Sequence, residues 1–156
     1  MFGASVSACA CLLLKTDTPV TVLAVSSCLI GSVFPDIDNP DSSFGHMTKP
    51  VSTLIGSVSG AVGKTGSNHR GVFHDFGAHL SGLVLSLLFM PSLAFFFMGT
   101  LSHLFLDMFN PSGIPVMFFW KARAGRLRSG EKPSVVFTLI ASLLTIVFGL
   151  TYGLMM

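Results

Sequence analysis

Long apolar runs with few charges between them are the feature that most restricts what this chain can fold into. Four such runs stand out, at residues 2–14, 19–34, 71–110 and 134–156. Only 10% of the 156 residues are charged, whereas soluble domains carry about 25%. A helix needs about 20 mostly apolar residues to cross the ~30 Å hydrocarbon core of a bilayer. The sequence therefore predicts an integral membrane protein and excludes an ordinary soluble globule.

The run at 71–110 is long enough for two membrane helices. Pro91 lies near its middle, and proline ends a helix because it lacks a backbone N–H and clashes with the preceding turn. The run at 2–14 is short and has no basic residue before it, so we interpret it as a retained short membrane helix and not as a secretory signal. The predicted fold is all-α, a multi-span transmembrane bundle of four to five helices that forms one domain over residues 1–156.

Two polar loops, at about 35–70 and 110–133, separate the apolar runs. With five spans both loops lie on the same side of the membrane. The first contains three Lys or Arg residues and the second contains five, which leaves only Lys15 of the nine on the opposite side. The positive-inside rule places the two loops in the cytoplasm. The expected partner is membrane lipid, and the net charge of +2 gives no indication of nucleic acid.

The first loop also contains a helical pattern. Apolar residues recur at helical spacing, at Val51, Leu54, Ile55, Val58 and Val62. Pro50 precedes them, and proline is favoured in the first turn of a helix. The pattern predicts a short amphipathic helix that lies at the membrane surface.

Aspartate and histidine residues gather at the predicted cytoplasmic ends of three helices. They are Asp36 and Asp38 after the second helix, His69, His74 and Asp75 at the start of the third, and His103 and Asp107 near the end of the fourth. At 1.5 Å per residue, His74 and His103 lie roughly 18–24 Å from the break at Pro91. They can therefore face each other at similar depth.

This arrangement suggests a metal site. His103 and Asp107 are four residues apart and share one helix face, where ionisable groups among apolar neighbours are costly unless paired or functional. A divalent cation binds neutral imidazole and carboxylate together, and mixed His/Asp sites suit Zn, Mn or Fe. Such a site activates water and polarises a phosphoryl or carbonyl oxygen. Six candidate ligands would serve one or two ions: Asp36, Asp38, His69, His74, His103 and Asp107.

Simpler interpretations stay open for the individual residues. Asp36 and Asp38 could belong to a turn or a helix cap, and His79 could pair with Asp75. A non-catalytic membrane protein could also use the whole cluster as a structural metal site or as an ion pathway. Against the ion pathway, transporter sites tend to lie near the bilayer midplane, whereas this cluster lies toward one side.

Three motifs, in order, resemble a known family. They are Phe34-Pro-Asp-Ile-Asp-Asn-Pro, His69-Arg-Gly-Val-Phe-His74 and Gly99-Thr-Leu-Ser-His-Leu-Phe-Leu-Asp107. They are similar to the Leu-Pro-Asp-Ile-Asp-His-Pro, His-Arg-Gly-x-Thr-His and Gly-x-x-Ser-His-x-x-x-Asp patterns of the LexA-regulated, YdjM-like family of bacterial inner-membrane-associated metal-dependent hydrolases. The resemblance covers about residues 1–120 and leaves a variable last helix at 134–156.

The resemblance implies an inner-membrane hydrolase that carries metal on the six candidate ligands. It makes Arg70 a candidate for holding an anionic substrate, because guanidinium pairs bidentately with phosphate. Asp38 or Asp75 would act as general base. Because the site lies at head-group level, we expect cleavage of an ester or phosphoester bond in a lipid or lipid-linked substrate.

The sequence departs from the family pattern in two places. Family members carry a histidine near the N-terminus, whereas the first histidine here is His46. Phe73 and Asp75 stand where the family has Thr and Ser. Asp75 is therefore a candidate additional ligand, or a carboxylate partner of a ligating histidine. The missing N-terminal histidine also leaves open a degenerate family member that acts as a scaffold and not as an enzyme.

Overall fold

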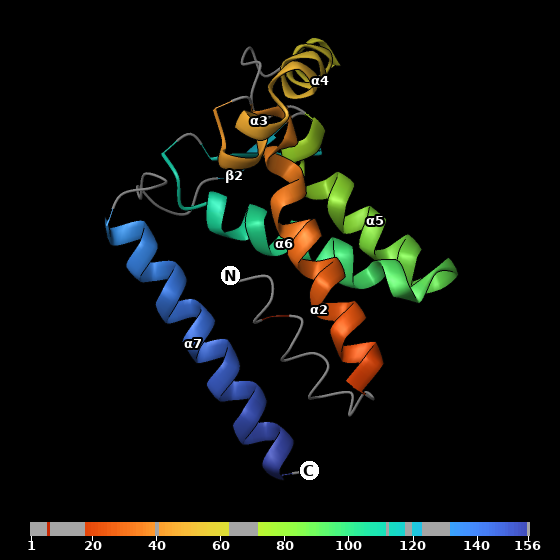
Figure 1. The fold of residues 1–156 in the computed structure, drawn as a ribbon, viewed down its shortest axis with the longest axis vertical. Helices are drawn as coiled ribbons and strands as arrows, with labels where there is room; N and C mark the ends of the chain where they lie inside the picture. Colours follow the sequence, from red (N-terminus) through yellow and green to blue (C-terminus); the bar gives the residue numbers. More distant parts are fainter. Residues whose placement is uncertain are drawn as a thin grey trace.

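The structure is a computed structural model that describes residues 6, 18–39, 41–62, 72–111, 113–117, 120–122 and 132–155. These residues are mostly helical, which confirms the all-α class (Figure 1). Apart from Val6, the helix predicted at 2–14 lies outside them. The elements are α2 (Thr18–Val33), the 3-10 helix η1 (Phe34–Asp38), α3 (Ser43–Met47), α4 (Lys49–Val62), η2 (Val72–His74), α5 (Phe76–Phe89), η3 (Pro91–Leu93), α6 (Ala94–Asp107), β1 (Ile114–Val116), β2 (Trp120–Ala122) and α7 (Lys132–Met155).

The predicted break in the 71–110 run is confirmed. Helix α5 ends at Phe89, and Pro91 begins the 3-10 turn η3, from which α6 starts. The two helices pack against each other. The other two apolar runs, at 19–34 and 134–156, become α2 and α7 with shifts of one or two residues at their ends.

Helices α2 and α6 make the most extensive contact between described elements. Their backbones approach closely because glycine lies on both sides of the contact. A Cβ on Gly99 would collide with the Cys28 carbonyl oxygen, and one on Gly31 would collide with the Phe96 carbonyl oxygen. Small residues at helix contacts are typical of membrane proteins, where close packing replaces the hydrophobic effect between helices.

Large apolar side chains face outward, and much of the described interior is small or polar. Leu23 and Ile30 on α2 and Leu85 and Leu88 on α5 are between 54% and 70% exposed. The buried polar residues include Asp38, His74, Thr100 and Ser102. In water this distribution would be unfavourable, because exposed apolar area is costly. It suits a chain surrounded by lipid.

One helix in the part of the chain that the structure describes, Val20–Asp38, is long and apolar enough to cross a bilayer. It comprises most of α2 together with η1. The apolar helices Phe76–Phe89 and Val135–Val147 are shorter than a full span. A bundle of four to five spans therefore stays a prediction.

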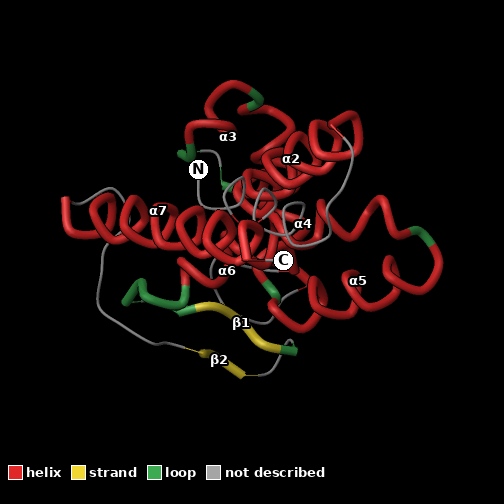
Figure 2. The backbone as a smooth tube through the Cα atoms, turned by 90° about the horizontal axis from the view of Figure 1, so that it is seen from below, coloured by secondary structure: helices red, strands yellow, loops and turns green. Residues whose placement is uncertain are grey.

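The two loops contain more structure than the sequence pattern indicated. Asp36 and Asp38 lie on the 3-10 helix η1 and not in an irregular loop. The amphipathic helix is confirmed as α4, with Pro50 as its second residue. The second loop contains an unpredicted antiparallel pair of strands, β1 and β2, in which Ile114 pairs with Ala122 (Figure 2). Ile114 is fully buried, and β1 packs against α5.

Candidate metal centre

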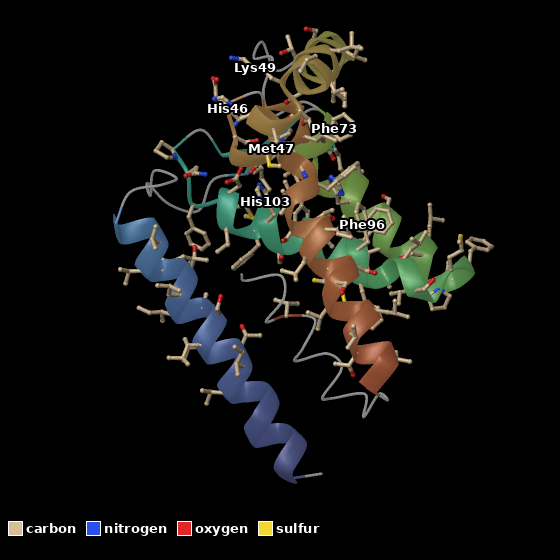
Figure 3. All side chains as sticks on the ribbon, in the orientation of Figure 1. His46, Met47, Lys49, Phe73, Phe96 and His103 are labelled. Atoms are coloured by element: carbon tan, nitrogen blue, oxygen red, sulfur yellow. The ribbon has the colours of Figure 1, made fainter. Side chains whose placement is uncertain are left out.

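Three segments that are distant in the sequence bring five Asp and His side chains together. Segment η1 contributes Asp36 and Asp38, η2 contributes His74, and α6 contributes His103 and Asp107. We call these five residues the Asp/His cluster. Segments η1, η2 and α6 meet because η1 packs against both of the others. His103 lies on α6, below α3 in the view of Figure 3.

Four of these side chains direct donor atoms toward one another. Oδ1 of Asp36 lies 3.8 Å from Nε2 of His74 and 3.7 Å from Nε2 of His103. Oδ2 of Asp107 lies 3.8 Å and 3.9 Å from the same two nitrogens. The donor atoms of Asp36, His74 and His103 all lie within 4.8 Å of one another. The two carboxylates thus face the same pair of imidazole nitrogens.

The spacing of these donors fits a divalent cation. It is longer than the roughly 2.7–3.2 Å of an N–H···O hydrogen bond. It is close to the ~3.4 Å expected between two ligands that each lie about 2.1 Å from a tetrahedral ion. Nε2 of His103 is buried and makes no hydrogen bond to the described residues. Two imidazole nitrogens with two carboxylate oxygens form a mixed donor set suited to Zn, Mn or Fe.

Asp38 faces the other nitrogen of His74. Its Oδ1 lies 3.5 Å from Nδ1 of His74, and both side chains are fully buried. A carboxylate at this position keeps the proton on Nδ1 and directs the Nε2 lone pair toward a metal. The structure therefore places Asp38 behind the His74 ring, on the side away from the nitrogen that faces Asp36 and Asp107.

The cluster has surplus negative charge, since three carboxylates surround two imidazoles. Burial opposes protonation of His74, but Asp36, Asp38 and Asp107 outweigh it and raise the pKa of His74 from 6.5 to about 9. A divalent cation would neutralise the same surplus. The side chain of Asp36 is 32% exposed, compared with 19% for His103 and 14% for Asp107. The cluster is therefore most open to its surroundings at Asp36.

Two residues that the sequence analysis did not single out hold the cluster in place. Nδ2 of the buried Asn110 donates to Oδ1 of Asp107 over 2.7 Å, which leaves Oδ2 to face the imidazoles. Oγ of Ser52 donates to the carbonyl oxygen of Ile37 over 2.7 Å and fixes η1 from α4. The three-residue spacing of Asn110 from Asp107 was a usable signal. Ser52 gives no such signal, because it is 15 residues from Ile37.

Asp75 caps a helix in the structure, and its predicted roles as general base, additional ligand or partner of a ligating histidine stay predictions. Its side chain is fully buried, and its Oδ1 accepts from the Ala78 N–H over 2.9 Å and from the Met117 N–H over 3.2 Å. It thus caps α5 and connects that helix to the end of β1. Nε2 of His79, the predicted partner of Asp75, lies 2.9 Å from the carbonyl oxygen of Phe73.

His69 and Arg70 lie outside the described residues. Their predicted roles, as a metal ligand and as the group that holds an anionic substrate, stay predictions. The cluster that the structure brings together consequently contains five of the six candidate ligands. Asp36, His74 and His103 have donor atoms within 4.8 Å of one another, Asp107 faces the two histidines, and Asp38 lies at the other nitrogen of His74.

Comparison with known proteins relates the whole chain to one family. A family model described as YdjM inner membrane protein matches residues 1–155. The inner membrane protein YdjM of Escherichia coli (strain K12) is 31% identical over 107 residues, which cover 64% of this chain and 50% of that protein. The protein of the same name from Shigella flexneri matches with the same identity and coverage. The chain spans about half the length of these curated relatives. No solved structure matches the chain.

Proposed function

This chain belongs to the family of YdjM inner membrane proteins, and on that premise we propose that it is a metal-dependent hydrolase embedded in the bacterial inner membrane. Its divalent cation, one Zn, Mn or Fe ion, is held by Asp36, His74, His103 and Asp107. The substrate is an ester or phosphoester in a lipid or lipid-linked molecule. The chain crosses the membrane several times, with the cluster facing the cytoplasm.

The observation that carries this proposal is the convergence of four donor atoms from three separate segments. Local sequence cannot produce it, since η1, η2 and α6 are joined by long stretches of chain. Carboxylates and imidazoles gathered in a partly buried place cost free energy unless their charges are compensated. The separations of 3.7–3.9 Å between facing donors leave room for a cation to supply that compensation.

The residues of the cluster divide into binding and positioning groups. Asp36, His74, His103 and Asp107 bind the cation. Asp38 keeps the proton of His74 on Nδ1, and Asn110 turns Asp107 so that one oxygen faces the imidazoles. The bound cation supplies Lewis acidity toward a phosphoryl or carbonyl oxygen of the substrate.

Asp36 is the most exposed of these residues, so the substrate approaches the cluster from its side. Arg70, outside the described residues, is proposed to bind the anionic part of the substrate.

Two features support the membrane part of the proposal. The outward faces of α2 and α5 carry large apolar side chains, which match a lipid surround. Eight of the nine Lys and Arg residues belong to the two polar loops, which favours a cytoplasmic position for those loops. The cluster lies where the first of these loops joins α2 and α5. A cluster at this level, near the lipid head groups, could reach the ester and phosphoester bonds of a lipid or lipid-linked substrate.

A structural metal site is the second candidate, and the burial of the cluster favours it. His74 and Asp38 are fully buried, whereas a catalytic centre must remain open to substrate. The two candidates differ in what metal removal does. A structural ion should leave a partly unfolded chain when it is removed, whereas a catalytic ion should leave a folded chain without hydrolytic activity.

The first experiment is the metal content of detergent-purified protein, measured by elemental mass spectrometry without chelators in the buffers. We expect stoichiometric metal in the unaltered chain and its loss in His74→Ala and Asp107→Ala, with helical circular dichroism retained. His46→Ala is the matched control, because His46 is exposed on α3 and should keep its metal. Metal-free unaltered protein, or equal metal in all four proteins, would refute the proposal. If the unaltered protein retains its metal, that protein would then be tested for hydrolysis of phosphoester and lipid ester substrates.

A further inference from the structure

Helix α4 lies directly against the segments that carry the Asp/His cluster. It packs on η1 and η2, and its buried residues include two small ones, the fully buried Ser52 and the buried Gly56. Figure 1 shows α4 nearly end-on, beyond the end of α2, whereas α2 is seen from the side. The axis of α4 therefore crosses the direction of α2 and does not continue it.

The rest of the α4 surface is divided between two kinds of side chain. Val51, Leu54 and Val58 form an apolar sector and are 53%, 67% and 57% exposed. Thr53 and Ser57 form a polar sector and are also exposed. At about 100° per residue, the protein-facing, apolar and polar sectors are separated by roughly 100–150° around the helix. One helix thus presents three different surfaces in three directions.

Three sectors of this kind match a helix at the junction of protein, hydrocarbon and water. An interfacial helix buries its apolar face about 5–10 Å into the boundary between head groups and acyl chains, with its polar face in water. The location of α4 agrees with this. Segment η1 continues α2 and η2 precedes α5, and both of those helices carry outward apolar side chains. Helix α4 therefore lies where the apolar surface of the molecule ends.

The size of the apolar sector argues against a second protein as its occupant. A stable protein interface buries about 800 Å² on each partner. Three partly exposed aliphatic side chains offer far less than that. A bilayer does not have to meet such a threshold, because α4 is already held beside it by the rest of the chain.

We propose that α4 lies in the head-group layer of the bilayer, with Val51, Leu54 and Val58 toward the acyl chains. In this position α4 holds the Asp/His cluster at the depth of the head groups. The connection runs through Ser52, whose hydroxyl donates to the carbonyl oxygen of Ile37 over 2.7 Å. Ile37 lies between Asp36 and Asp38, so α4 fixes the turn that presents both carboxylates. The cluster then opens at the level of the ester and phosphate groups of a lipid. This inference rests on the proposed membrane embedding but not on hydrolysis.

Spin labels on α4 would test this placement. In a chain with Cys9, Cys11 and Cys28 replaced by alanine, a single cysteine is introduced at Val51, Leu54 or Val58, and at Thr53 or Ser57 as matched controls on the same helix. The labelled full chain is reconstituted in vesicles of phosphatidylcholine and phosphatidylglycerol. Power saturation then compares collisions with oxygen, which concentrates in lipid, and with a water-soluble nickel chelate. Circular dichroism and metal content confirm that each labelled protein is folded.

We expect labels at Val51, Leu54 and Val58 to collide preferentially with oxygen, and labels at Thr53 and Ser57 to collide preferentially with the chelate. A label at Leu88, on the outward face of α5, separates the possible failures. If the labels on α4 collided mainly with the chelate while the label at Leu88 collided mainly with oxygen, the placement of α4 would be overturned and the membrane embedding would stand. A label at Leu88 that collided mainly with the chelate would overturn both the placement of α4 and the membrane embedding. Spin–spin broadening at Val51 or Leu54 that disappears on dilution with unlabelled chain would show a second copy in place of lipid and would also overturn the proposal.

Discussion

His74 has carboxylates near both of its ring nitrogens, and their roles differ. Nε2 faces Asp36 and Asp107, each 3.8 Å away, whereas Nδ1 faces Asp38 at 3.5 Å. Metal binding would require the neutral imidazole, which carries one proton, and a carboxylate at Nδ1 would then leave Nε2 for the cation. Asp38 is thereby distinguished from the other acids by geometry, although its residue type and neighbouring position are like those of Asp36.

The variants Asp38→Asn and Asp107→Asn should differ in their effect on metal binding. Loss of a carboxylate that supports a ligating histidine typically weakens metal affinity by about 10–100-fold. We therefore expect Asp38→Asn to keep one equivalent of metal at saturation with this reduced affinity. Asp107→Asn should bind substoichiometrically under the same conditions. Competitive titration with a chromogenic chelator measures both quantities.

Asp41→Asn is the control for this comparison, because Asp41 is an exposed acid three residues after the end of η1. It should bind metal as the unaltered protein does. Equal losses in Asp38→Asn and Asp107→Asn would instead make Asp38 a ligand, as the sequence had suggested.

The carboxylate of Asp75 caps the N-terminus of helix α5. Asp75 occupies the N-cap position, with φ −78° and ψ 114°, and its Oδ1 accepts from Ala78 and Met117. The cap satisfies an N–H that the first helical turn leaves without an intrahelical partner. Because Met117 follows β1, the same carboxylate connects the strand pair to the helix that comes directly after His74.

Asp75→Ala should lower stability more than it alters the metal site. Removal of an N-cap costs about 0.5–2 kcal/mol of the free energy of unfolding, and the Met117 N–H loses its acceptor as well. We expect this loss in denaturant unfolding in detergent, with metal stoichiometry unchanged. A variant of normal stability that had lost its metal would instead make Asp75 an additional ligand.

The contact between α2 and α6 is set by backbone approach. Gly99 lies against the Cys28 carbonyl and Gly31 against the Phe96 carbonyl. This contact positions α6, and with it His103 and Asp107, relative to η1 at the end of α2. Packing at the glycines therefore fixes the geometry of the Asp/His cluster.

Gly99→Ala should destabilise the protein, because the added methyl group meets backbone that cannot rotate away. Overpacking of this kind costs about 1–3 kcal/mol, and metal affinity should fall with it. Gly82→Ala is the matched control, since the three nearest atoms there all belong to the Phe97 ring, a side chain that can change rotamer. The free energy of unfolding in detergent is measured for both variants. An equal loss of stability in the control would contradict this account of the contact.

At the scale of the whole molecule, the described residues have an inverted distribution of polarity. Large aliphatic side chains such as Leu23 and Leu88 face outward, while Asp38, His74 and Asp75 are fully buried. A lipid surround stabilises the first arrangement, and paired charges and helix caps stabilise the second; the proposed cation would add to the second. Membrane residence and a charge-compensated Asp/His cluster are therefore energetically consistent with each other.

Topology reporters should place the two polar loops on one side of the membrane and the turn at Pro91 on the other. A cytoplasm-specific reporter inserted after Lys64 should be active, and one inserted after Ser92 should be inactive. The reverse pattern is expected for a reporter that is active only in the periplasm. Identical results at both sites would mean that α5 does not cross the bilayer, which would contradict the multi-span prediction.

The membrane class, the main helices and the residue types of the cluster could all be predicted from the amino-acid sequence alone. Apolar runs and Pro91 act locally, through hydropathy and the missing backbone N–H, so they are readable without a fold. The family motifs likewise contain Asp36, His74, His103 and Asp107 in order along the chain.

The way in which those residues face one another became clear from the three-dimensional structure. Which carboxylate meets which nitrogen of His74 depends on how η1, η2 and α6 are rotated and spaced, and that is set by the close α2–α6 contact at Gly31 and Gly99. Ser52 reaches Ile37, and Asp75 reaches Met117 across 42 residues. Such contacts arise from packing between distant segments, and no local pattern in the sequence specifies them.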